Sequence, residues 1–203
     1  MKSLSEIDTL SKRASRALGF DWGIAEEVGK NIRMLEMLGI PGIKNLNHYY
    51  KVKEKKNYEK IELIRQENQK KKLEYCPIIA GVNFLDQVRT LHDLNEVKFY
   101  NLAFPILFLP FVSRASEVIG KKILLEIDNS KFLLNYNNSI YCNSMNNGIV
   151  TIGNHVWIRF LENIDTFDEK EWKELYKLSE RTFVEENDSL KQSSAGAGLI
   201  DND

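Results

Sequence analysis

The spacing of the hydrophobic residues changes along the chain, and this change limits the folds open to it. Before about residue 120 the apolar residues recur at helical spacing, whereas residues 121–160 hold short alternating or β-rich runs typical of strands. We therefore expect an α+β fold in one domain, in which an N-terminal αα-hairpin and further helices pack on a small, mainly antiparallel sheet.

The first helices have clear boundary signals. Ser3 and Glu6 form the pattern of a capping box, and Gly19 ends the first helical stripe. Asp21 is a good N-cap for a second helix, and residues 43–52 continue as a third, short helix. The first two helices, joined by a short link, form the expected αα-hairpin.

Residues 51–72 are rich in charge, with nine lysines and arginines against four acids. The acids interleave with the bases at spacings that suit i,i+4 pairs, so we interpret the segment as a solvated, mobile helix. A nucleic-acid patch is the less favoured alternative.

The middle of the chain supplies the core. Pro77 favours a helix that starts after Cys76, and residues 106–109 suit either a short buried strand or a tight helical turn. A helix over residues 111–119 should end at Gly120. We expect the following side chains to be largely buried: Phe108, Leu109, Ile123, Leu125, Leu133 and Trp172.

Two hairpins are expected in the sheet. The first pairs residues 121–127 with residues 131–136. The second pairs residues 149–152 with residues 155–160 across a Gly153-Asn154 turn. Together they predict a sheet of about four strands.

The C-terminal part consists of a helix and a tail. Asp168 caps a helix that runs to about residue 183. In the tail, residues 193–203, Leu199 and Ile200 favour docking, which would bring three terminal polar residues to one place. We expect an ordered tail whose acids meet an arginine, with these candidates: Arg181, Arg114 and Arg33.

Composition bounds the class of protein. Of 203 residues, 43% are hydrophobic and 10% aromatic, which excludes wholesale disorder. We expect a single domain over residues 1–203, with a helical part at about 1–120, a sheet at about 121–160, and a C-terminal helix and docked tail at about 168–203. The net charge of −1 argues against nucleic acid as the partner.

The N-terminus has no signal-peptide pattern, and the longest apolar run is too short to cross a bilayer, so we expect a cytoplasmic protein without a membrane partner. Cys76 and Cys142 lack paired spacing, and the three histidines lack metal-ligand spacing. We expect free thiols, no metal and no cofactor.

Several residues are candidates for a site. The catalytic candidates are Glu26 and Asp201 as general bases and Cys76 as a thiol near a helix N-terminus. A buried, inert Cys76 is the commoner alternative, and Glu26 and Glu27 also suit a helix N-terminus without any chemistry. The candidates for ligand binding are Trp22, Glu27, Asp86, Arg181, Asn202 and Asp203.

Three motifs carry a resemblance that spans the chain. They are W-G-x-A-E-E-x-G at residues 22–29, C-P-x-x-A-G at residues 76–81 and G-A-G-L-x-D-N-D at residues 196–203. In these the chain resembles an uncharacterised bacterial family, domain-of-unknown-function family 3726. It departs from the family at residues 185–188, where relatives carry a proline and small residues, and in its lysine-rich segment. The resemblance implies no activity.

Two functions remain open. The first is a small-molecule enzyme or ligand-binding protein with a site near the C-terminal tail. The second is an interaction or accessory subunit whose tail docks on a partner or on the other copy in a homodimer. The sequence does not decide whether the protein is an enzyme.

Overall fold

The computed structural model describes residues 2–69, 73–143 and 149–182. Contacts divide the chain into two units, residues 1–163 and residues 164–203, and each is described by itself. The α+β class is confirmed, and the expected single domain over residues 1–203 stays a prediction. The helices of the first unit are α1 (Leu4–Ala17), α2 (Trp22–Met37), α3 (Gly42–Lys53), α4 (Pro77–Leu91) and α5 (Leu109–Ile119).

The helical hairpin forms where its boundary signals predict it. Ser3 accepts from the backbone N–H of Glu6, whose carboxylate accepts from the Ser3 N–H, so the capping box is present. Gly19 turns the chain at a φ of +88°, which glycine adopts without strain. Asp21 precedes α2 in an extended conformation, but its side chain makes no capping hydrogen bond.

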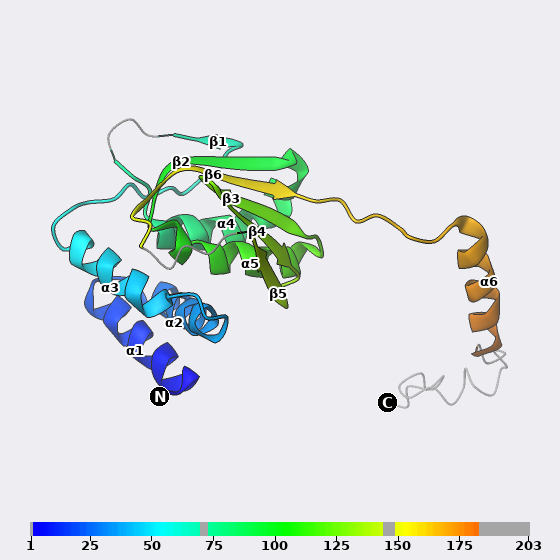
Figure 1. Cartoon of the computed structure of the whole chain (residues 1–203), viewed down its shortest axis with the longest axis horizontal. Helices are drawn as coiled ribbons and strands as arrows, with labels where there is room; N and C mark the ends of the chain where they lie inside the picture. The colour runs from blue at the N-terminus through cyan, green and yellow to red at the C-terminus, as the bar shows by residue number, and fades with distance from the viewer. Residues whose placement is uncertain (1, 70–72, 144–148, 183–203) are drawn as a thin grey trace, which may run out of the picture. The chain divides into compact units, whose positions relative to one another are not determined.

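The described strands form one six-stranded sheet in the order β1-β2-β6-β3-β4-β5, rather than the expected four strands. Helices α4 and α5 run across one of its faces (Figure 1). The pairs are antiparallel except β1 with β2. The strands are β1 (Glu67–Asn68), β2 (Glu96–Ala103), β3 (Ile123–Ile127), β4 (Ser130–Asn135), β5 (Ser139–Cys142) and β6 (Ile152–Phe160).

The β3–β4 hairpin is confirmed, but the second predicted hairpin is wrong. Residues 152–160 form the single strand β6, which passes straight through Gly153 and Asn154. A Cβ atom on Gly153 would lie 2.8 Å from Val156 Cγ2 and 3.2 Å from Pro105 Cγ. This glycine therefore permits a close approach rather than a turn. Strand β6 pairs with β3 on one side and with β2 on the other. Strand β2 lies outside the predicted sheet range, and its Val97 and Phe99 face the core.

The predicted helix over residues 51–72 is also wrong. Helix α3 ends at Lys53, and the described residues that follow run without a helix to β1. Side-chain amides of α4 make hydrogen bonds with backbone groups of this segment. Gln87 accepts from the Ile64 N–H, and Asn83 donates to the carbonyl of Ile61. With Ile61 and Ile64 buried, the segment is held by tertiary contacts instead of helical hydrogen bonds.

The expected core is confirmed at four positions and corrected at two. Phe108, Leu109, Ile123 and Leu125 are fully buried. Leu133 is half-buried, because the register turns its neighbours on β4, Phe132 and Leu134, toward the helices. Residues 106–109 take the helical alternative: a 3₁₀ turn, η2 (Pro105–Leu107), leads into α5. A second short turn, η1 (His92–Leu94), follows α4.

The described part of the second unit is a short amphipathic helix, α6 (Glu169–Ser179), followed by η3 (Glu180–Thr182). Asp168 and Glu171 form a capping box, as the Asp168 signal predicts. Phe167 stacks on Trp172 at 5.5 Å between ring centroids, which makes a hydrophobic staple across the cap. Trp172 is 52% exposed, so its predicted burial is wrong.

Candidate functional site

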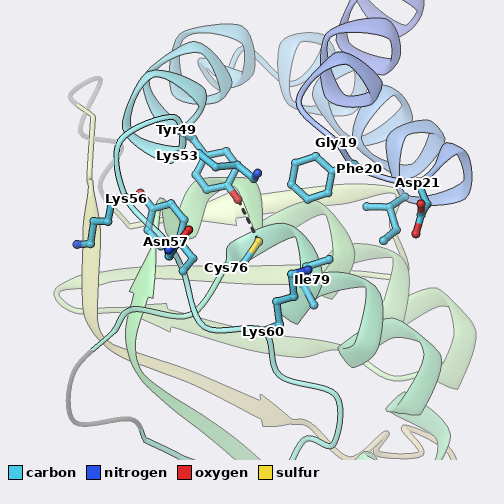
Figure 2. Close-up of a pocket in the computed structure, with 12 residues that line it drawn as sticks. Gly19, Phe20, Asp21, Tyr49, Lys53, Lys56, Asn57, Lys60, Cys76 and Ile79 are labelled. Carbon is cyan, nitrogen blue, oxygen red and sulfur yellow. Dashed lines mark hydrogen bonds between the residues drawn. The ribbon is translucent and has the colours of Figure 1, made fainter.

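A pocket of about 160 Å³ lies in the first unit, where the helical hairpin meets the start of α4 (Figure 2). Its walls come from four segments: the α1–α2 turn with the start of α2, the end of α3, the chain after α3, and the first turn of α4. We call it the Tyr49 pocket. Its lining residues are Gly19, Phe20, Asp21, Ile24, Tyr49, Lys53, Lys56, Asn57, Tyr58, Lys60, Cys76 and Ile79.

Local sequence features bring these segments together. The Gly19 turn delivers Phe20, whose ring lies 6.4 Å from that of Tyr50 on α3. Pro77 starts α4 directly after Cys76, and the Cys76 N–H donates to the carbonyl of Glu59 in the chain after α3. A turn, a helix start and backbone hydrogen bonds between the chain after α3 and the segment before α4 therefore help to fix the pocket.

Tyr49 and Cys76 form the floor of the pocket. The Tyr49 hydroxyl and the Cys76 sulfur lie 3.0 Å apart, and both side chains are buried. Burial raises the pKa of the Cys76 thiol and that of Tyr49. The thiol is consequently protonated at neutral pH, and a protonated thiol is a poor nucleophile.

Tyr58 stacks on Tyr49 at 5.3 Å between ring centroids. Burial raises the pKa of Tyr58 to about 12. Its phenol therefore remains neutral and able to donate a hydrogen bond over the physiological pH range.

Three lysines surround the pocket, and they differ in their partners. Lys56 donates to Glu74 Oε1 at 2.6 Å. Lys53 donates to the carbonyl of Leu18 at 3.3 Å, and its ammonium lies 5.0 Å from the centre of the Phe20 ring. Within the described residues neither Lys53 nor Lys60 pairs with a carboxylate. In Figure 2 these two lysines approach the pocket from opposite sides, while Lys56 points away.

A second polar cluster joins α2 to α5. Arg114 contacts the carboxylate of Glu27, which also accepts from Lys30 at 2.8 Å. Although burial opposes ionisation, Arg114 and Lys30 hold the pKa of Glu27 below its usual value. The Arg114 guanidinium is 3.5 Å from Asn31 Oδ1. Glu27 therefore links α2 to α5 through Arg114, and it does not line the Tyr49 pocket.

Among the described residues of the first unit, the other predicted site residues do not line the Tyr49 pocket. Trp22 is 56% exposed, with the Arg16 guanidinium 5.6 Å from its ring centre. Glu26 is exposed and lies 3.9 Å from the Lys12 ammonium. Asp86 on α4 and Arg181 in η3 are exposed. Asp201, Asn202 and Asp203, with the rest of the tail, lie outside the described residues.

The cations proposed for the tail acids include two that already have partners. Arg114 contacts Glu27, and Arg33 lies 3.7 Å from Asp8 Oδ2.

Of the predicted site residues that the structure describes in the first unit, Cys76 lines the Tyr49 pocket. Phe20, Tyr49, Lys53 and Lys60 were missed as a site, although the lysine-rich segment with nearby tyrosines was the signal that could have found them.

In the part of the chain that the structure describes, no group of three or more His, Cys, Asp or Glu side chains could hold a metal ion. No helix among the described residues has both the length and the apolar content needed to cross a bilayer.

A family model described as a protein of unknown function, DUF3726, matches residues 2–75. The match confirms the predicted resemblance over this part of the chain. It covers α1, α2, α3 and the segment up to Tyr75, and so includes most of the pocket lining. Comparisons with curated proteins and with solved structures found no match.

Proposed function

We propose that this protein binds a small molecule in the Tyr49 pocket. The observation that carries the proposal is the pocket itself, in which aromatic walls and polar groups from four segments converge. A concavity in which polar groups converge beside aromatic and aliphatic side chains is a usual form of a ligand site, and here lysines and an amide line it together with Phe20, Tyr49 and Ile79. An apolar cavity of roughly 150 Å³ accepts benzene, so a volume of about 160 Å³ suits a ligand of about one ring.

Binding is favoured over catalysis by the chemistry of the lining. Asp21 is the one carboxylate among the described lining residues, and it is exposed at the mouth. Cys76 lacks the lowered pKa that an activated thiol needs, because burial raises it. These groups do not form a nucleophile with an adjacent base, which is the arrangement that covalent catalysis uses.

A fragment screen with one blocking variant tests this function. Small neutral, anionic and cationic fragments are added to ¹⁵N-labelled protein, and amide shifts are mapped. We expect the shifts to cluster at Tyr49, Lys53 and Ile79 and to disappear in Ile24→Trp, whose larger side chain fills the pocket. The control is Leu63→Trp, because Leu63 is 66% exposed and lies outside the lining. Binding that survives Ile24→Trp, or no fragment that shifts these amides, would contradict the proposal.

A second candidate function is assembly into a homodimer through α6. The apolar stripe of this helix is exposed, and it is formed by Trp172, Leu175 and Tyr176. The first turn of α6 is acidic and its last turn is basic. Antiparallel pairing of α6 with α6 of a second copy would bury the stripe and place each acidic end beside a basic end, under two-fold symmetry.

Light scattering after size exclusion tests this candidate. The homodimer hypothesis expects twice the monomer mass for the unmodified protein and a monomer for Trp172→Ser with Leu175→Ser. Leu10→Ser is the control, since Leu10 is equally exposed but on α1. A monomer at high concentration would contradict this candidate and leave the ligand proposal standing.

The cellular setting that we propose is the bacterial cytoplasm. Cys76 and Cys142 are not joined in a disulfide, which is the usual state of cysteines in a reducing compartment. With a net charge of −1, we do not expect nucleic acid as the partner. Fractionation of cells that express the tagged protein tests the location, and an extracytoplasmic signal would contradict it.

A further inference from the structure

We propose that the ligand of the Tyr49 pocket is an organic anion of about one ring in size, whose oxyanion lies between Lys53 and Lys60. The inference rests on the proposed function, because it names the chemical class that the same pocket selects. The shared chemistry is an oxyanion, either a carboxylate or a phosphate ester, attached to a flat apolar body.

The charge of the pocket supports an anion. Three lysines and one aspartate line it, and Glu74 neutralises only Lys56. Neither Lys53 nor Lys60 has a carboxylate partner among the described residues. The two side chains approach the pocket from opposite sides (Figure 2). In the same view Asp21 lies on the far side of Phe20 from Lys53. An oxyanion between the two ammonium groups would supply the charge that the chain does not provide there.

The two lysines should contribute unequally. The side chain of Lys53 is half-buried against Phe20, whereas Lys60 is exposed. Charge interactions are screened less when they are partly buried. Lys53 is consequently expected to be the stronger contact, with Lys60 contributing mainly at low salt.

The walls of the pocket support a flat body. Phe20 and Tyr49 present aromatic rings, and Ile79 adds an aliphatic side chain from α4. Tyr58 stacks on Tyr49 and keeps its proton, so its hydroxyl is available as a donor to an oxyanion. Inorganic phosphate would satisfy the lysines and leave these walls uncovered.

Four probes separate charge from shape, each titrated into the full-length protein by calorimetry. They are benzoate, its neutral analogue benzamide, the cation benzylamine, and inorganic phosphate. We expect benzoate to bind at least about tenfold more tightly than benzamide, because the attraction between the lysine ammonium groups and a negative charge is lost in the neutral analogue. Benzylamine and phosphate should bind more weakly than benzoate.

Substitutions locate the anion. We expect Lys53→Gln to weaken benzoate about tenfold and Lys60→Gln to weaken it less, while Lys53→Arg retains more affinity than Lys53→Gln. Lys44→Gln is the control, because Lys44 is an exposed lysine of α3 outside the pocket lining. Thermal melting of each variant shows whether it is folded, and Lys60→Gln, at an exposed position, tests the inference if Lys53→Gln fails to fold.

The outcomes distinguish this inference from the function on which it rests. If benzoate and benzamide bind with equal affinity and both are lost in Ile24→Trp, the proposal of an anionic ligand is wrong, while the proposal of a ligand site in this pocket stands. Benzoate binding that neither Lys53→Gln nor Lys60→Gln weakens would also overturn the anion. If inorganic phosphate binds and benzoate does not, the proposed flat apolar body of the ligand would be ruled out. If no probe binds and the fragment screen is also negative, both proposals fall.

Discussion

Replacing Gly81 with alanine should destabilise the first unit, because Gly81 of α4 lies directly against the ring of Phe111 on α5. A Cβ atom at this position would lie 2.1 Å from Cδ2 and 2.5 Å from Cγ of Phe111. Phe111 is 1% exposed, so its ring cannot simply turn out into solvent. The helices must move apart, or the ring must leave its preferred rotamer.

Two opposing terms set the size of the effect. Inserting a methyl group into a close-packed core costs about 1–3 kcal/mol. Alanine is a better helix former than glycine, and this offsets up to about 1 kcal/mol. The clash involves the base of a buried ring rather than the end of a flexible chain, so we expect a net loss of about 1–2 kcal/mol for Gly81→Ala.

Urea denaturation followed by circular dichroism measures this loss. The control is Gly23→Ala in the first turn of α2, where nothing lies within 4 Å of the added Cβ. Gly23→Ala should leave the free energy of unfolding unchanged or raise it by up to about 1 kcal/mol. Stability of Gly81→Ala equal to or higher than that of the unmodified protein would refute the packing argument.

A double-mutant cycle provides a second test. Phe111→Leu and Gly81→Ala should show an interaction energy, since the two side chains share one space.

Further predictions concern the core, the thiols and the tyrosines. Leu125→Ala should cost about 2–5 kcal/mol in urea denaturation, and Leu133→Ala clearly less, because Leu125 is fully buried and Leu133 is not; equal losses would contradict the assigned register. Iodoacetamide should modify half-buried Cys142 before buried Cys76, as peptide mass spectrometry can show; the reverse order would mean that the thiol of Cys76 is accessible. The pKa of Tyr58 is raised to about 12, above its unfolded value of about 10, so its contribution to stability should be intact below about pH 10 and lost as the pH rises toward 12. Tyr58→Phe should reduce this alkaline loss, and an unchanged pH profile would count against it.

Elements with local signals could be predicted from the sequence. The capping box at Ser3 and the Pro77 start of α4 appear as expected. So does the end of α5 at Gly120, where φ is +63°. Each signal acts within a few residues, because a cap or a positive φ is fixed by the side chain at that position.

Features that depend on distant residues were missed. The described residues of the charge-rich segment after Lys53 are not helical, and Asn83 and Gln87 of α4 make hydrogen bonds to their backbone groups instead. Gly153 resembles a turn residue, yet it serves a close approach to Pro105. Such effects depend on tertiary contacts that a local pattern does not contain.

The candidate site was predicted only in part for the same reason. Cys76 was chosen for its place before a helix, and it does line the pocket. Its thiol is buried among residues from three other segments, which no local spacing could indicate. The aromatic partner Tyr49 is 27 residues away in the sequence.

The central place of β6 in the sheet has a consequence for synthesis on the ribosome. This strand joins β2 to β3, although it is the last of the described strands to be translated. Until Phe160 emerges, the β1–β2 pair and the β3–β4–β5 meander each present an unpaired edge that β6 later occupies. Nascent chains with such edges are prone to pair with the wrong strand. Chaperone binding should therefore be strongest on chains stalled before residue 152, and it should fall once β6 has been released from the exit tunnel.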